Sequence, residues 1–249
     1  MITAAVVLVG VVAFLVTVNR TELTSRATPA PRPRAVAVTV PSPTLSVDDV
    51  ARAQLVRTVT IEALGSNDEG LGTGWLFDAK GDFVTNAHVV EGHLAVRIRA
   101  RDGSSHVGDV LGVDRAVDIA MIRSRDGFSG TPMTPSTTVI TTFPQSVVVI
   151  ASSHATGHGD ITDETVTRIE ADVPVNGDTT TGQAPTTTDY HDMLTLDGQA
   201  VYPGNSGGPV LDRQGQVVGI LTLSSKSAAE AFAIQISRVI TELTAFAAR

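Results

Sequence analysis

The sequence predicts an all-β fold, and three observations support this prediction. Val, Ile and Thr, whose branched side chains favour pleated strands, are abundant. Short apolar stretches recur along the chain, each bounded by Gly, Asp or Pro residues that are typical of turns. Their spacing matches an antiparallel barrel better than an alternation of strands and helices. With 249 residues, of which 42% are hydrophobic, the chain can bury one full core or two smaller ones.

Composition excludes several classes of protein. The net charge is −8 and no basic run interleaves with aromatic residues, so we expect no nucleic-acid partner. The chain has no cysteine, which excludes disulfides, a thiol nucleophile and thiolate metal sites. His154 and His158 lie near Asp160, but Gly157 and Gly159 argue against a helix that would bring the histidines together. We therefore expect no metal and no other cofactor.

The N-terminal segment, residues 1–18, is apolar and uncharged. Its length is at the short end of what spans a bilayer as a helix, and we predict a transmembrane anchor. A cleaved secretory signal is the alternative, although no basic residue precedes the apolar run and no small-residue cleavage motif follows it. Four arginines follow the segment, which by the positive-inside rule would keep the rest of the chain in the cytoplasm. The membrane orientation therefore stays open.

Residues 19–47 contain five prolines. Proline fixes φ and removes a donor, so this stretch is predicted to be an extended, polyproline-like linker without a core of its own.

The pattern changes at Ser46, which with Asp48 and Asp49 can cap a short helix that ends at about residue 56. A strand is predicted at 59–64. Residues 71–77 and 83–90 read as a hairpin with polar residues at its tip. Further strands are expected at 95–100, 106–113 and 119–123. We assign residues 48–135 to a first β-barrel.

Residues 131–142, rich in Pro and Thr, are predicted to connect two halves of the fold. Strands are expected at 146–152, 165–171, 193–196, 210–211, 216–223 and 232–234. The acidic stretch 176–192 indicates a long surface loop or lid. Apolar residues then recur at helical spacing from Ile236 to Phe246, which predicts a closing amphipathic helix. We assign residues 136–249 to a second barrel plus this helix.

Three short stretches carry residues suited to nucleophilic catalysis. Ser206 lies between glycines in Gly-Asn-Ser-Gly-Gly-Pro. Glycine lets the backbone adopt unusual conformations and approach another group closely, which a serine nucleophile and its neighbouring N–H donors require. His88 ends the predicted strand in Thr-Asn-Ala-His-Val-Val, and Asp118 opens the apolar run Asp-Ile-Ala-Met-Ile. Serine needs a base within hydrogen-bond reach, and a histidine held by a carboxylate supplies one.

These stretches, together with Gly-Thr-Gly-Trp at 72–75 and Phe-Ala-Ile at 232–234, resemble the signatures of the chymotrypsin-like serine proteases, specifically the HtrA/Deg branch. The order along the chain is the same, and the resemblance covers about residues 50–240. It implies two antiparallel six-stranded β-barrels with the site in the cleft between them. It also implies a serine endopeptidase that acts on peptide or unfolded-protein substrates through an acyl-enzyme intermediate.

The resemblance assigns a role to each site residue. Ser206 would be the nucleophile, His88 the general base, and Asp118 the residue that orients the histidine and stabilises the imidazolium. The N–H groups of Gly204 and Ser206 would form the oxyanion hole.

The substrate pocket is assigned from the same resemblance. Ala200 stands six residues before the serine, where trypsin-like members carry a charge-reading side chain. Thr222, Leu223 and Ser224 are predicted to face the substrate backbone, with Ala231 on the far wall. Since no acidic residue lies at the pocket base, we expect cleavage after small or medium apolar residues.

Some features of the family are missing from this sequence. Asn205 stands where digestive members carry the acidic residue that pairs with a newly cut N-terminus, so we expect no such activation switch. No PDZ-like module is recognisable after the second barrel, and oligomerisation is possible but not indicated. The alternative function is a protease-like binding or sensor domain whose site is latent. An extracytoplasmic adhesion module has no support beyond the anchor and linker.

Overall fold

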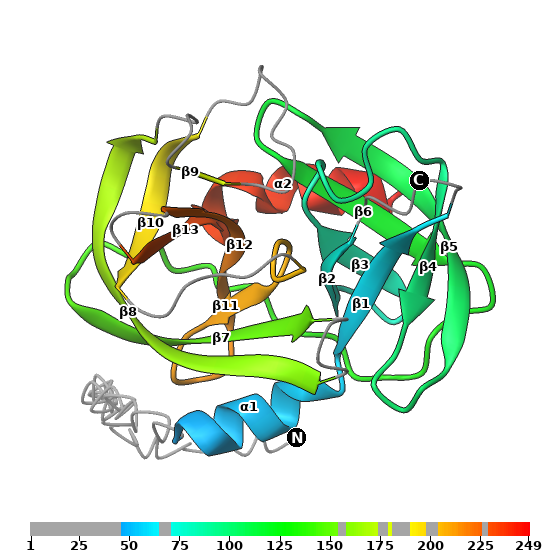
Figure 1. Cartoon of the computed structure of the whole chain (residues 1–249), viewed down its shortest axis with the longest axis horizontal. Helices are drawn as coiled ribbons and strands as arrows, with labels where there is room; N and C mark the ends of the chain where they lie inside the picture. The colour runs from blue at the N-terminus through cyan, green and yellow to red at the C-terminus, as the bar shows by residue number, and fades with distance from the viewer. Residues whose placement is uncertain are drawn as a thin grey trace, which may run out of the picture. The chain divides into compact units, whose positions relative to one another are not determined.

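The computed structural model describes residues 46–64, 71–153, 158–173, 179–180, 190–197, 204–225 and 229–249. Two groups of antiparallel strands, with one helix before them and one after, make up this part of the chain (Figure 1). The predicted anchor at 1–18 lies outside the described residues, as does the predicted linker at 19–47 apart from its last two residues. No helix within the described ranges is long and apolar enough to cross a membrane.

The first group of strands forms a closed six-stranded barrel in the order β1-β2-β3-β6-β5-β4. Helix α1 (Val47–Leu55) precedes it and begins where predicted, because the Ser46 hydroxyl accepts the Asp49 N–H. Alternate strand residues, among them Ile61, Phe83 and Ile122, are fully buried in the barrel interior. The strands are β1 (Thr58–Ala63), β2 (Leu71–Leu76), β3 (Asp82–Thr85), β4 (Ala95–Arg99), β5 (Ser105–Asp114) and β6 (Ile119–Ser124).

One predicted strand in this barrel is too long. The strand expected at 83–90 ends at Thr85, so His88 lies in a turn and does not end a strand. The turn is closed by hydrogen bonds from Val90 N–H to Ala87 O (3.1 Å) and from His93 N–H to Val90 O (3.0 Å). The apolar residues that suggested a longer strand are buried under this turn instead of pairing in the sheet.

The second group also closes into six strands, in the order β11-β7-β8-β10-β13-β12, because β11 pairs with β12. Two six-stranded antiparallel barrels were predicted and are confirmed. The strands are β7 (Gln145–Ser153), β8 (His158–Asp172), β10 (His191–Asp197), β11 (Pro209–Leu211), β12 (Val217–Ser225) and β13 (Glu230–Gln235). A two-residue strand, β9 (Thr179–Thr180), adds to β12 within the stretch predicted as a loop at 176–192, most of which lies outside the described residues.

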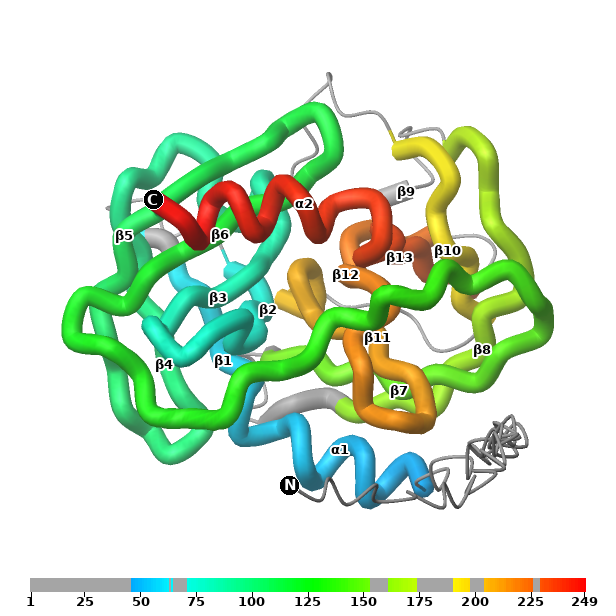
Figure 2. Tube along the Cα trace, turned by 180° about the vertical axis from the view of Figure 1, so that it is seen from behind, coloured from blue at the N-terminus to red at the C-terminus, as the bar shows by residue number. Residues whose placement is uncertain are grey.

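Helix α2 (Ile236–Ala247) confirms the predicted closing helix and connects the two barrels. It follows directly from β13 in the second barrel and ends beside β5 and β6 of the first (Figure 2). Phe246 packs on Gly112 of β5 so closely that a Cβ at residue 112 would overlap the ring. An apolar cluster that includes Trp75, Met121, Ile220 and Leu243 fills the space between the barrels and α2.

Candidate active site

Asp118 and His88 form a buried pair on the first barrel. His88 Nδ1 lies 2.9 Å from Asp118 Oδ2 and 3.0 Å from Oδ1, and the His88 main-chain N–H donates to Oδ1 at 3.0 Å. The Asp118 side chain is fully buried and that of His88 is 5% exposed. An ionised carboxylate only accepts, so we assign the imidazole proton to Nδ1, which leaves the lone pair of Nε2 free to take a proton.

Two hydroxyls from the second half of the chain also donate to the Asp118 carboxylate. They are Thr222 Oγ1 on β12 and Tyr190 Oη, the latter at 3.1 Å from Oδ2. Asn86 Nδ2 holds the Asp118 main-chain carbonyl at 2.9 Å, and Asp118 itself has φ +56°, an unusual conformation for aspartate. Several bonds therefore hold this residue in a conformation that it does not prefer.

Tyr190 was missed by the sequence reasoning. It lies in the stretch predicted to be a surface loop or lid, yet it is buried and reaches Asp118 from a position 72 residues away in sequence. No local pattern marks it. Thr222 was predicted to line the substrate strand, and the structure turns its side chain toward Asp118.

Ser206 joins the same network from the second barrel. Its Oγ donates to the main-chain carbonyl of Thr222 at 3.4 Å, a long bond, and the Thr222 hydroxyl contacts Asp118. The described residues show no hydrogen bond between Ser206 Oγ and the His88 ring. The structure thus brings Ser206, His88 and Asp118 to one place, with the serine hydroxyl turned to Thr222.

The turn around Ser206 requires its glycines. Gly204 and Gly207 have φ of +97° and +88°, a region that other residues rarely adopt, and a Cβ at Gly207 would overlap Thr73 O. The Gly207 N–H donates to Leu221 O at 2.8 Å. By contrast, no acceptor in the described ranges is bonded to the N–H of Gly204 or of Ser206.

The predicted pocket residues lie on neighbouring strands. Leu223, Ser224 and Ala231 are buried, and Ser224 of β12 pairs directly with Ala231 of β13. Directly opposed residues on paired strands have side chains on the same face, so Ser224 and Ala231 can share one wall of a pocket. Ala200 lies outside the described residues.

Sequence comparisons identify one family and several curated relatives. The model of the trypsin-like peptidase domain matches residues 72–220. The putative serine protease HhoA of Synechocystis is 33% identical over 153 residues, which is 61% of this chain and 36% of that protein. The serine protease Do-like HtrA of Bacillus subtilis is 27% identical over 157 residues, 61% of this chain and 33% of that protein. The chain therefore spans about a third of the length of these relatives.

Solved structures share the two-barrel fold. A serine-to-alanine mutant of Rv3671c from M. tuberculosis H37Rv, in an inactive form, has a TM-score of 0.64 at 24% identity, and the match covers 84% of this chain and 96% of that one. The HtrA-type protease AlgW with a tripeptide has a TM-score of 0.66 at 22% identity and covers 81% of this chain and 63% of its own. At such identities the likeness concerns the fold alone.

Proposed function

The chain belongs to the trypsin-like peptidase domain family, and from this membership and the site geometry we propose that it is a serine endopeptidase with Ser206, His88 and Asp118 as its catalytic triad. One observation supports the proposal most strongly. His88 Nδ1 is bonded to a buried Asp118 carboxylate, and Ser206 Oγ reaches the same network through Thr222. A histidine held in this way has the tautomer that a general base requires.

In the proposed reaction, Ser206 Oγ attacks the carbonyl carbon of the scissile bond while its proton passes to His88 Nε2. The hydroxyl must first rotate away from Thr222 O, and a 3.4 Å bond opposes that rotation only weakly. The N–H groups of Gly204 and Ser206 stabilise the tetrahedral oxyanion. His88 then gives the proton to the leaving amine, and a water molecule, deprotonated by His88, hydrolyses the acyl-serine ester.

The proposed substrates are peptides or unfolded proteins cut after small or medium apolar residues. Ala231 and Ser224 offer little volume and no charge on their shared wall, whereas the Leu223 side chain points to the opposite face of β12 and is buried between the barrels. Ala200 adds no charge at its position either. A peptide library tests this preference. Cleavage mainly after Lys or Arg would contradict it.

We place the protease domain on the extracytoplasmic side of a bacterial membrane, tethered by residues 1–18 or secreted if they are cleaved. The apolar segment and the proline-rich stretch after it support the tether, not the side of the membrane. A relative from Halomonas elongata, 28% identical over 160 residues, is described as a probable periplasmic serine endoprotease. Fractionation of cells that express the full chain tests the location, because recovery in the cytoplasmic fraction would contradict it.

Labelling with a serine-directed fluorophosphonate tests the triad. The wild-type chain is expected to be labelled, and Ser206→Ala and His88→Ala to lose the label. Ser136→Ala is the matched control, since Ser136 is also buried but its hydroxyl bonds only Thr138 N–H among the described residues. Labelling that survives Ser206→Ala would refute the nucleophile assignment. A folded wild-type chain that takes no label would instead support a latent binding or sensor domain.

A further inference from the structure

We propose that Thr73 is a positioning residue for this reaction, because its side-chain hydroxyl fixes the turn that presents the oxyanion donors. The inference rests on the proposed function, in which the N–H groups of Gly204 and Ser206 receive the oxyanion. Thr73 lies on β2 of the first barrel and is fully buried. The sequence reasoning placed it in the Gly-Thr-Gly-Trp motif but gave it no role.

Thr73 holds the turn at two carbonyls. Its main-chain N–H donates to Ser206 O at 2.7 Å, and its Oγ1 donates to Gly204 O at 2.8 Å. The same Oγ1 accepts the N–H of Ser152, on β7 of the second barrel, at 2.7 Å. A longer contact, 3.3 Å, joins Oγ1 to Ser152 O, and since a hydroxyl has one proton we assign that proton to the shorter bond with Gly204.

These bonds orient most peptide planes of the turn. A peptide unit is planar, so a bond to its carbonyl also fixes the N–H of the next residue. The Asn205 carbonyl accepts the Gly208 N–H at 3.0 Å, which orients the plane that carries the Ser206 donor. The Ser206 carbonyl is held by the Thr73 N–H, as described. Neither of these two bonds involves the Thr73 side chain.

The Gly204 donor depends on the Thr73 hydroxyl. The Gly204 N–H belongs to the peptide plane before this residue, and the Gly204 carbonyl belongs to the plane after it. The φ and ψ angles of Gly204 set the orientation of these two planes relative to each other. Glycine restricts those angles less than any other residue, so the carbonyl must be held if the N–H is to keep one direction. In the described part of the chain, Thr73 Oγ1 is the only group that donates to Gly204 O. Without it, the Gly204 carbonyl can rotate and take the N–H out of line.

The chemistry explains why a hydroxyl is needed here. The group must accept from Ser152 N–H and donate to Gly204 O at the same time, and among short side chains only Ser and Thr can do both. Replacement by the isosteric valine leaves both backbone groups buried and unpaired. Because an oxyanion donor acts mainly in the transition state, loss of its alignment lowers kcat more than it raises KM.

Two variants and one control test this inference. Thr73→Val removes the hydroxyl and Thr73→Ser keeps it. Thr60→Val is the matched control: Thr60 pairs with Thr73 across β1 and β2 and its Oγ1 lies 2.6 Å from Ser152 Oγ, but it does not contact the turn. The readouts are the rate constant for fluorophosphonate labelling, kcat and KM on a fluorogenic peptide with valine before the cut, and the thermal midpoint.

Removal of one oxyanion donor costs about 100- to 1000-fold in kcat, so misalignment in Thr73→Val is expected to cost about 10- to 100-fold, with KM within about threefold. The labelling rate should fall in parallel, because the phosphonyl oxygen occupies the same hole. Thr73→Ser and Thr60→Val should stay within about threefold of wild type in both rates, even where their thermal midpoints fall.

The inference is overturned if folded Thr73→Val keeps the wild-type rates, or if Thr60→Val loses as much. If Thr73→Val does not fold, Thr73→Ser is the deciding variant, because it keeps the hydroxyl. A folded Thr73→Ser that loses kcat tenfold or more, about 1.4 kcal/mol, would show that the hydroxyl is not what aligns the donor. An inactive, unlabelled wild-type chain would refute the proposed function and this inference with it. Wild-type activity that Thr73→Val leaves unchanged would refute the inference alone.

Discussion

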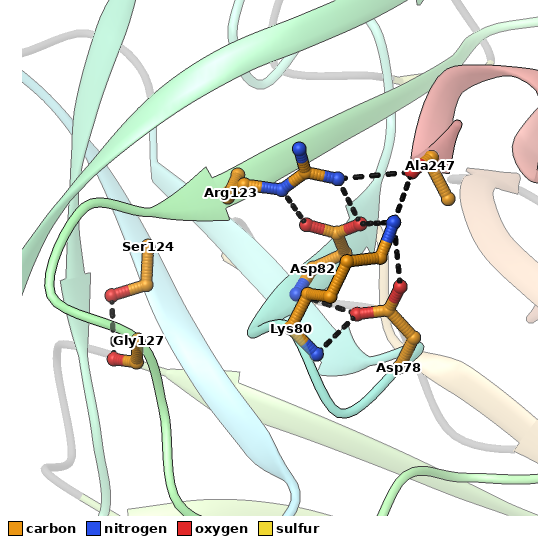
Figure 3. A network of polar contacts seen from close by, with 7 residues as sticks. All are labelled: Asp78, Lys80, Asp82, Arg123, Ser124, Gly127 and Ala247. Atoms are coloured by element: carbon orange, nitrogen blue, oxygen red, sulfur yellow. Dashed lines mark hydrogen bonds and ion pairs between the residues drawn. The ribbon is translucent and has the colours of Figure 1, made fainter. Parts of the chain in front are cut away.

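Replacing the buried carboxylate of Asp82 with an amide, in Asp82→Asn, tests how the last helix is held on the first barrel. The Asp82 side chain is fully buried and accepts from Arg123 Nε at 2.6 Å and Nη2 at 2.7 Å (Figure 3). Arg123 Nη2 also donates to Ala247 O at 3.0 Å, and Lys80 Nζ donates to the same carbonyl. Cations at the C-terminus of a helix offset the partial negative charge of its last carbonyls.

The size of the effect follows from burial. Removing one partner of a buried ion pair costs about 3–5 kcal/mol, because the other charge is left without compensation. The Arg123 side chain is 27% exposed and can recover some hydration, so we expect the lower end, about 3 kcal/mol. The hydrogen bond to Asp82 raises the pKa of Arg123 in the wild type. The guanidinium also stays charged in the variant, because the ordinary pKa of arginine lies far above neutral pH. For a domain of this size, the loss corresponds to a fall of about 6–12 °C in the thermal midpoint.

The assay is urea and thermal unfolding of Asp82→Asn beside a matched control. Asp109→Asn removes the same kind of carboxylate from a two-point pair between β5 and Arg125, which directly follows β6, but both side chains of that pair are more than half exposed. Exposed pairs contribute little, so the control should leave the midpoints nearly unchanged. A loss below about 1 kcal/mol in Asp82→Asn, or an equal loss in both variants, would refute the reasoning from burial.

Two further predictions concern the turn at the nucleophile and the C-terminal helix. Gly207 and Gly103 have nearly the same φ, +88° and +89°, but a Cβ added at Gly207 would overlap other atoms, whereas one added at Gly103 would have none within 4 Å. Alanine at each position tests this difference. Gly103→Ala should lose about 1–2 kcal/mol from strain alone in urea unfolding, and Gly207→Ala clearly more, together with fluorophosphonate labelling. Equal losses would show that Thr73 O yields to the new methyl group. Burial raises the pKa of Glu242 most, and its hydrogen bond and charge repulsion with Asp114 raise it further. Wild-type stability therefore falls as pH rises from the unfolded pKa of about 4.3 through the raised folded pKa. Glu242→Gln should therefore be more stable than wild type at pH 7 and equal to it below about pH 4, and a urea midpoint difference that does not change with pH would contradict this sign.

The fold was predictable where its signals are local. The Ser46 cap and the apolar period from Ile236 to Phe246 place both helices within a residue or two of their observed ends. Strand length was less predictable, because it depends on a partner strand. Residues 83–90 are mostly apolar, but the pairing of β3 with β6 runs only over Asp82–Thr85, and the chain then turns. Likewise β8 begins seven residues before the predicted 165, since β7 offers it a partner as far as His158.

The candidate site was likewise predictable only where its signals are local. His88, Asp118 and Ser206 each lie in a short motif whose residue types reveal the chemistry, so the sequence could nominate them. The groups that support them come from far along the chain. Thr222 and Tyr190 reach Asp118 across 104 and 72 residues, and no periodicity or spacing connects them. Only the packing of the second barrel on the first shows which hydroxyl meets the buried carboxylate.

The polar bonds between the two barrels explain why the site cannot belong to either one. The first barrel carries His88 and Asp118, while the second carries Ser206 and the Thr222 hydroxyl that Asp118 requires. Thr73 also joins the two barrels, since its hydroxyl on the first barrel bonds both Gly204 O and the Ser152 N–H of β7 in the second. Each of these groups is buried, so a small separation of the barrels would leave several unpaired at once, at a cost of about 1–3 kcal/mol each. The same bonds that position the candidate site residues therefore hold the barrels together, and α2, anchored by Arg123, adds its packing to the same interface.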